Sequence, residues 1–344
     1  MRKICRTGQT GRTGPTTPLK TMIDSHGRKI NYLRLSVTDR CNMRCRYCLP
    51  EEGVKKLPRD EILRYDELFR IVQAAVELGI EKVRITGGEP LVRSGLTGFI
   101  SRISKLNGLK HLVLTTNGLL LDGVAEELKS AGVQRLNISL DSLRPEVFAA
   151  ITRGGDLSHV LAGINAAEKA GFPIKINMVV MRGVNDSEIV DFATLAVSKP
   201  FSVRFIEYMP AIKESNWQAL VVPAREILSC IGKKFNYTPI TPDDFAGPAK
   251  EFRLEGGAGA IGVISPLSGH FCGSCNRIRI KATGIARGCL FSARELDLKP
   301  YIRTLNSQCL LDALRFIVFG KPHMHRLTEH QAVHSAFNMI HIGG

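Results

Sequence analysis

The sequence has 344 residues, of which 44% are hydrophobic and 23% are charged, and its net charge is +15. These values are ordinary for a globular protein with a full core, and no apolar run reaches the roughly 18 residues of a transmembrane helix. The basic balance fits a polyanionic small substrate, a nucleic acid or a membrane surface. Because aromatic residues are few and no basic run is present, we expect a phosphorylated small substrate, with no nucleic-acid and no membrane partner.

The N-terminal segment is basic and contains no acidic residue. Its positive charges are Arg2, Lys3, Arg6, Arg12 and Lys20. We predict that residues 1–22 are disordered, with Met22 as an alternative start. A mitochondrial transit peptide would also be basic, but this segment lacks amphipathic helical spacing. We therefore expect a cytoplasmic protein, and a mitochondrial matrix protein only if residues 1–20 are a transit peptide.

Short apolar runs alternate with helical patterns from residue 33 onward. Runs rich in Val, Ile and Leu predict buried parallel strands at 33–37, 82–86, 111–115, 134–140, 174–180 and 202–207. Helices are predicted over 66–78, 121–131 and 157–170, and each is followed by a glycine that can end it. Six strand–helix units predict an α/β fold, an incomplete (β/α)6 TIM-type barrel; a doubly wound sheet is the alternative.

The pattern changes after about residue 210. Short strand-like pieces broken by Gly and Pro occupy 238–285, and 303–319 has a helical pattern. We therefore predict a partial barrel over 23–237 and a small C-terminal α+β region over 238–344 that closes the open side of the barrel.

Six of the nine cysteines form two tight groups, a pattern that indicates metal ligands. Cys41, Cys45 and Cys48 follow the first predicted strand directly. Three thiolates can hold three irons of a four-iron cubane, which leaves the fourth iron open to a small molecule. A structural zinc site with a distant fourth ligand is the alternative, although zinc usually takes four protein ligands.

The second predicted strand runs into a Gly-Gly-Glu-Pro loop at residues 87–90. Two glycines allow the backbone to approach a ligand closely, and Glu89 could accept a hydrogen bond from an ammonium group. Functional sites of parallel α/β sheets lie at the carboxyl ends of the strands, where this loop begins.

The second cysteine group is Cys272, Cys275 and Cys289, again without an obvious fourth ligand, although His270 could complete a zinc site. Between these cysteines, a strand-like segment alternates basic and apolar residues over 277–281, so its basic side chains share one face. Such a face could simply be solvated. Beside a metal cluster, we interpret it as a phosphate-binding surface.

Together these motifs resemble the radical S-adenosylmethionine (SAM) superfamily and, within it, the GTP 3′,8-cyclase family of molybdenum cofactor biosynthesis. The resemblance covers residues 23–344 and rests on segments 33–41, 84–90, 114–118, 137–141 and 205–210, the second triplet and the terminal Gly343-Gly344. It implies a radical enzyme that cyclises GTP to (8S)-3′,8-cyclo-7,8-dihydroguanosine 5′-triphosphate. In that reaction, the 3′ hydrogen of the ribose is removed and the sugar carbon then attacks guanine C8.

The resemblance also implies residue roles. A first [4Fe–4S] cluster that binds SAM is expected on Cys41, Cys45 and Cys48, and a second [4Fe–4S] cluster facing guanine on Cys272, Cys275 and Cys289. The SAM site is expected to comprise Tyr47, Gly88, Ser139 and Met209. The GTP site is expected to comprise Arg34, Arg84, Thr115, Lys175, Arg204, Arg277 and Arg279, and the last two are also the catalytic candidates.

Further expectations concern the C-terminal tail and the partners. The terminal glycines are expected to reach toward the active site, and His323, His325, His330 and His334 are interpreted as non-ligating. We expect a homodimer that takes electrons from a donor and passes its product to cyclic pyranopterin monophosphate synthase. Two alternatives remain: another two-cluster radical enzyme, such as a peptide-modifying one, and a basic zinc module that binds nucleic acid.

Overall fold

The computed structural model describes residues 21–209, 216–269 and 271–325. Within them, one sheet of 12 strands runs through the molecule in the order β12-β11-β10-β1-β2-β3-β4-β5-β6-β9-β8-β7. Its centre is formed by the parallel strands β1 (Tyr32–Ser36), β2 (Lys82–Thr86), β3 (His111–Thr116), β4 (Arg135–Ser139), β5 (Ile174–Val180) and β6 (Ser202–Glu207). The sheet curves without closing, which confirms the expected partial barrel.

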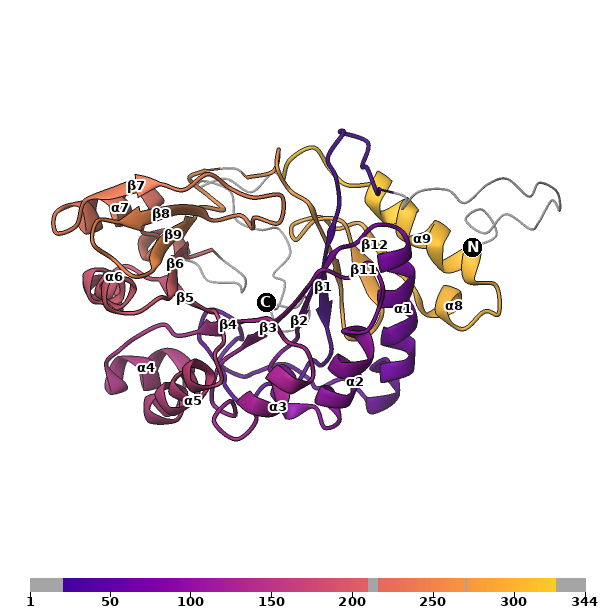
Figure 1. Ribbon diagram of the computed structural model, residues 1–344, viewed down its shortest axis with the longest axis horizontal. Helices are drawn as coiled ribbons and strands as arrows, with labels where there is room; N and C mark the ends of the chain where they lie inside the picture. Colours follow the sequence, from indigo (N-terminus) through magenta and orange to yellow (C-terminus); the bar gives the residue numbers. More distant parts are fainter. Residues whose placement is uncertain (1–20, 210–215, 270, 326–344) are drawn as a thin grey trace.

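Helices connect these strands and lie along the outer side of the sheet (Figure 1). They are α1 (Tyr65–Glu77), α2 (Leu96–Ile103), α3 (Ala125–Ser130), α4 (Pro145–Thr152), α5 (Leu157–Lys169) and α6 (Ile189–Ser198). In α1, the side chains of Leu68, Ile71 and Val72 recur at helical spacing and are fully buried. Gly79 follows with a φ of 98°, in the left-handed region that favours glycine, and so ends the helix.

The C-terminal region extends both edges of the same sheet. Beside β6 lie β9 (Ala260–Ile264), β8 (Lys250–Leu254) and β7 (Tyr237–Pro239), preceded by α7 (Ala224–Gly232). Beside β1 lie β10 (Arg277–Ile280), β11 (Ile285–Arg287) and β12 (Glu295–Asp297), followed by α8 (Lys299–Ile302) and α9 (Ser307–Phe319). The boundary that we predicted near residue 238 therefore falls inside a continuous sheet, in β7.

Two predicted helices differ from the structure at their starts. The predicted helix 121–131 begins only at Ala125. The predicted helix 303–319 begins at Ser307, because the Asn306 side chain accepts a hydrogen bond from the backbone N–H of Gln308 and caps the helix there. Asn is a preferred capping residue, so its position was the available signal for this later start.

The N-terminal end of the described chain is part of the core. The Met22 side chain is buried, and its carbonyl accepts a hydrogen bond from the Ile30 N–H at 2.8 Å. Residues 1–20 of the segment predicted to be disordered lie outside the described residues, as do His270, His330, His334, Gly343 and Gly344. No helix in the described part of the chain is long and apolar enough to cross a bilayer.

Candidate functional site

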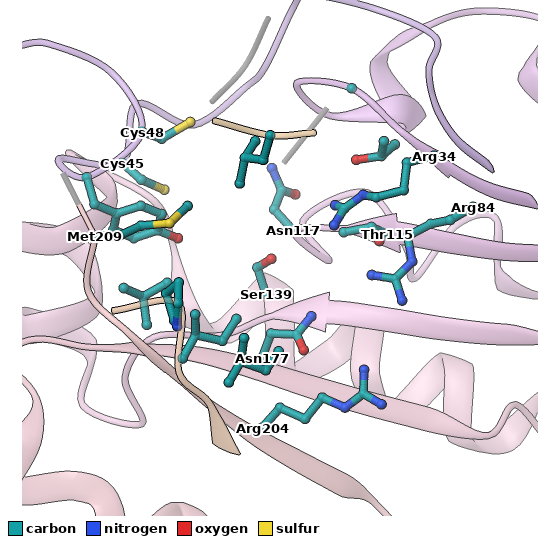
Figure 2. A pocket seen from close by; sticks show the side chains of 18 of the residues that line it. Arg34, Cys45, Cys48, Arg84, Thr115, Asn117, Ser139, Asn177, Arg204 and Met209 are labelled. Carbon is teal, nitrogen blue, oxygen red and sulfur yellow. The ribbon is translucent and has the colours of Figure 1, made fainter. Parts of the chain in front are cut away.

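A cavity of about 270 Å³ lies inside the partial barrel. Among the predicted site residues, the lining includes Arg34, Cys41, Cys45, Tyr47, Cys48, Arg84, Gly88, Thr115, Ser139, Arg204, Met209, Arg277 and Arg279. Figure 2 shows two chemically different ends: the sulfur atoms of Cys45, Cys48 and Met209 gather on one side, and the guanidinium groups of Arg34 and Arg84 on the other. Predicted site residues from distant parts of the sequence are thus brought to one cavity.

The first cysteine loop is attached to the glycine-rich loop by backbone hydrogen bonds. The N–H of Gly88 donates to the Thr38 carbonyl and that of Glu89 to the Arg40 carbonyl, both at 2.8 Å. A Cβ atom at position 87 would lie 2.7 Å from the Thr38 carbonyl oxygen, so only glycine fits between the loops. Gly87 therefore serves first to bring the two loops together.

Glu89 is buried, and its carboxylate is occupied by the protein itself. One oxygen accepts from the Leu91 N–H at 3.0 Å and the Thr116 hydroxyl at 2.8 Å, and the other from the Asn117 N–H at 2.6 Å. Burial raises the pKa of Glu89 to about 7 despite these donors. These contacts make Glu89 the residue that positions the loop after β3. That Glu89 also accepts a hydrogen bond from a ligand's ammonium group stays a prediction.

The cysteines of the first triplet are partly buried, and carboxylates lie near two of them, Cys41 and Cys45. Burial raises the pKa of Cys45 well above its usual value, and Asp141 and the neighbouring thiols add to the effect. The Tyr47 hydroxyl donates to Asp141 at 2.7 Å, and the Val179 N–H donates to its other oxygen at 2.8 Å. Burial also raises the pKa of Asp141 to about 6. A metal that displaces the thiol protons would fit such poorly solvated groups.

Asn117 is a residue of this loop environment that we did not predict from the sequence as part of the site. Its side-chain amide donates to the Asn42 side chain at 2.8 Å and lies 3.8 Å from the Cys41 sulfur. It follows β3 directly, so the rule that sites lie at the carboxyl ends of strands could have identified it.

The opposite end of the cavity is a layer of arginine side chains. Parallel register places Arg34 beside Arg84 on one side and beside Arg279 on the other, so alternate residues of three strands face the interior together. Burial, with the charge of Arg277, lowers the pKa of Arg279 to about 10. The buried Nε atoms of Arg84, Arg204 and Arg277 have no hydrogen-bond partner among the described residues. Buried charges are normally paired, so this layer fits a polyanionic ligand.

All seven predicted GTP-site residues are described by the structure, and Lys175 is the one of them that does not line the cavity. Its ammonium group donates to Glu251 at 2.9 Å, and Arg204 donates to the same carboxylate oxygen at 2.5 Å. Two further inward-facing cations were not predicted from the sequence, Lys82 and Arg135, at the starts of β2 and β4. Lys82 lies two residues before Arg84, and Arg135 two residues before Asn137, so strand alternation could have predicted that each pair faces the same side of the sheet.

The second cysteine triplet does not line the cavity but lies behind its arginine end. Burial raises the pKa of Cys275, but the charges of Arg277 and Lys321 outweigh it and lower the value to about 6. Lys321 was not predicted. Its ammonium group donates to the carbonyls of Arg277 at 2.7 Å and Gly288 at 2.6 Å, and it lies 3.7 Å from the Cys275 sulfur. It therefore links the strand after Cys275 to the residue before Cys289.

No three Cys, His, Asp or Glu side chains in the described ranges are grouped closely enough to hold one metal ion. A zinc ion needs its thiolates within about 2.3 Å, whereas a four-iron cluster distributes its thiolates over different irons. Each triplet is nevertheless a local group, because the thiols influence one another's ionisation. The donor set is therefore suited to a cluster.

An open parallel barrel with a three-cysteine loop after its first strand defines a radical SAM protein. A family model described as the radical SAM superfamily matches residues 35–196. A second model, described as Molybdenum Cofactor Synthesis C, matches residues 201–327. The basic zinc module is thereby set aside.

Similarity to known sequences extends along nearly the whole chain. It is 59% identical over 324 residues to GTP 3′,8-cyclase of Geobacter sulfurreducens, covering 94% of this chain and 99% of that protein. It is 47% identical over 326 residues to GTP 3′,8-cyclase of Syntrophomonas wolfei, covering 94% and 100%. The chain therefore belongs to the GTP 3′,8-cyclase family, as its motifs predicted.

Solved structures share the fold at low sequence identity. SuiB of Streptococcus suis aligns with a TM-score of 0.58 and 12% identity over 83% of this chain and 67% of that chain. The enzyme anSMEcpe with bound AdoMet aligns with a TM-score of 0.57 and 16% identity over 83% and 82%. At such identities the likeness concerns the fold, and it confirms the expected α/β class.

Proposed function

We propose that this chain cyclises GTP to (8S)-3′,8-cyclo-7,8-dihydroguanosine 5′-triphosphate, an early step of molybdenum cofactor synthesis. One observation carries the proposal: a single cavity joins the three-cysteine loop to a layer of buried guanidinium groups, in which the Nε atoms of Arg84, Arg204 and Arg277 have no hydrogen-bond partner among the described residues. A triphosphate offers the anionic oxygens that such a layer requires.

The superfamily uses a [4Fe–4S] cluster with SAM, and the first triplet is the group of residues that would hold the cluster. When bound and reduced, these cofactors supply the one-electron chemistry that takes a hydrogen atom from the substrate. Tyr47, Gly88, Ser139 and Met209 line the same cavity and would bind SAM. The protein itself contributes by holding the substrate in a fixed position, because a reaction between bound, oriented groups avoids the entropy cost of bringing them together.

The arginine layer has two tasks in this proposal. Arg34, Arg84 and Arg204 bind the triphosphate and so fix the ribose relative to the sulfur end of the cavity. Arg277 and Arg279 on β10 line the cavity beside the second triplet, where they would contact the nucleotide close to its reacting part. The low-dielectric interior strengthens each of these charge-assisted hydrogen bonds.

We further propose that Cys272, Cys275 and Cys289 hold a second [4Fe–4S] cluster facing guanine. The cationic surroundings of Cys275 support this, because they favour its thiolate form, which binds metal. A homodimer, an electron donor and transfer of the product to cyclic pyranopterin monophosphate synthase belong to the same proposal.

An anaerobic assay tests the function. Reconstituted protein is incubated with GTP, SAM and a reductant, and GTP loss and the cyclised product are followed by chromatography and mass spectrometry. Absence of GTP consumption would overturn the proposal. Arg277→Ala should lower GTP turnover about 100-fold and leave the iron held by the first triplet unchanged. The exposed Arg182, which pairs with Glu226, provides a matched arginine-to-alanine control that should keep full turnover.

A further inference from the structure

We propose that Glu251 is an internal substitute for a substrate phosphate. In the nucleotide-free protein it neutralises Lys175 and Arg204, and the terminal phosphates of a nucleoside triphosphate displace it on binding. The inference rests on the proposed GTP function and adds to it a residue that sets affinity and favours a triphosphate over shorter nucleotides.

The contacts of Glu251 are the first argument. A single carboxylate oxygen accepts hydrogen bonds from the Lys175 ammonium group at 2.9 Å and from the Arg204 guanidinium group at 2.5 Å. The Arg204 side chain is 6% exposed and that of Lys175 15%, so both cations are largely withdrawn from water. Two buried cations that share one anionic oxygen are held as a phosphate oxygen would hold them.

The backbone around Gly262 brings this trio together. In the sheet, Gly262 of β9 pairs with Arg204 of β6 on one side and with Glu251 of β8 on the other. A Cβ atom at position 262 would already contact the Cγ atoms of both residues at 3.4 Å. Because glycine has no side chain, Arg204 can cross the central strand and reach Glu251.

The charge balance of the barrel interior makes this carboxylate unusual. Among the described residues, no carboxylate forms an ion pair with the inward-facing Lys82, Arg84, Arg135, Arg277 or Arg279. Glu251 thus supplies a carboxylate to Lys175 and Arg204, whereas the five cations just named have none in the described part of the chain, and this deficit of carboxylates predicts where a polyanion binds.

The position of the trio along the barrel indicates which phosphates are concerned. Lys175 is the second residue of β5 and Arg204 the third of β6, whereas the first cysteine loop follows the opposite, carboxyl end of β1. A nucleotide whose sugar lies toward the sulfur end therefore directs its terminal phosphates to Glu251. Figure 2 shows Arg204 on the side of the cavity away from Cys48.

Displacement is physically reasonable because the competitors are unequal. A terminal phosphate carries more charge than a carboxylate and presents three acceptor oxygens instead of two. The Glu251 side chain is 27% exposed, so it has a path back to solvent once its partners bind phosphate. Lys175 and Arg204 therefore have an anionic partner both without nucleotide, where it is Glu251, and with nucleotide, where it is phosphate.

Calorimetry of anaerobic, reconstituted Glu251→Gln protein with GTP, GDP and GMP tests the inference. Removing the competing charge should tighten GTP binding about tenfold, with a smaller gain for GDP and little for GMP. Without nucleotide, the variant should melt at a lower temperature than wild type, and GTP should raise its melting temperature by more than it raises that of wild type. Unchanged or weaker GTP binding would mean that Glu251 is a scaffold, and an equal gain for GMP would also overturn the inference.

Two controls separate the possible failures. Glu226→Gln makes the same charge change at an exposed ion pair with Arg182 and should leave nucleotide affinity unchanged. If wild type and this control bind no GTP, the proposed function fails; if they bind GTP and Glu251→Gln does not tighten, only this inference fails. Should Glu251→Gln not fold, Glu251→Asp keeps the charge but shortens its reach, and should also tighten GTP binding; unchanged affinity would then overturn the inference.

Discussion

The two cysteine triplets lie in opposite electrostatic surroundings. Near Cys45, burial and the carboxylate of Asp141 oppose ionisation of the thiol, so its pKa is well above the usual value. Near Cys275, burial acts in the same direction, but Arg277 and Lys321 outweigh it and bring the pKa to about 6. Two groups with the same ligand number therefore differ in the charge that surrounds them.

This difference indicates a division of labour. Surrounding negative charge and poor solvation disfavour an added electron on a cluster, and surrounding positive charge favours it. A cluster on the first triplet would thus be strongly reducing, as radical generation from SAM requires. A cluster on the second would hold charge more readily and suits the binding of an anionic nucleotide. Substitutions at either triplet can test whether the two environments really separate these roles.

The largest effects are expected from removing one ligand of each triplet. Cys41→Ala should reduce SAM cleavage to background while iron at the second triplet remains. Cys272→Ala should leave reductive SAM cleavage and abolish GTP turnover. Iron and sulfide analysis with both assays measures this, and Cys230→Ala, at a free cysteine of α7, is the control. If both ligand variants lose the same activities, the two triplets do not have separate roles.

Lys321→Met should alter the second triplet alone. The substitution removes a buried cation and the donor that joins the Arg277 and Gly288 carbonyls. We expect roughly 10- to 100-fold weaker iron retention there and a more negative reduction potential. Iron release to a chelator and spectroscopic redox titration measure both quantities. Lys233→Met, at an exposed position at the end of α7, is the control. A change confined to the first cluster would contradict the proposed electrostatic difference between the two triplets.

The sequence predicts those features of the fold and site that depend on residues close together in the chain. The six central strands agree with the apolar runs to within about a residue at each end, because local runs of Val, Ile and Leu are enough to predict buried strands. The parallel pairing of β9 with β6 and of β10 with β1 was not predicted, since those partners lie far apart in the chain. The cysteines and arginines stood out by spacing and residue type.

Glu251 and Lys321 show what sequence reasoning cannot supply. An acidic residue on a short strand reads as a solvated surface group, and only the fold places Glu251 against Lys175, 76 positions earlier in the chain. Lys321 likewise follows Cys275 by 46 positions and meets it through tertiary packing. Neither position carries a local pattern, so the charge balance of both regions had to come from the structure.

A pH dependence of about tenfold is expected at the cationic end of the cavity. Burial and the charge of Arg204 lower the pKa of Lys175 to about 8. A phosphate needs the protonated ammonium group, so GTP affinity should be full near pH 7 and fall about tenfold by pH 9. Lys175→Arg stays charged over this range and should bind GTP almost independently of pH. Calorimetry across this pH range decides, and equal pH profiles would exclude Lys175 from phosphate binding.

The smallest expected effect concerns the anionic surroundings of the first triplet, near Asp141. Tyr47→Phe removes the hydroxyl that donates to Asp141 and favours its charged form. The pKa of Asp141, already about 6, should rise further, so that near pH 7 the carboxyl is more often neutral. The loss should cost about 1 kcal/mol of stability.

With less negative charge beside Cys45, the reduction potential of the first cluster should shift upward, and SAM cleavage should slow a few-fold. Tyr65→Phe, whose hydroxyl makes only a 3.5 Å contact with the Arg93 carbonyl, is the matched control. Lys321→Met should move the second potential downward, so the two substitutions should bring the potentials of the two clusters closer together. Shifts in the same direction would show that the surroundings of the triplets do not set the difference between them.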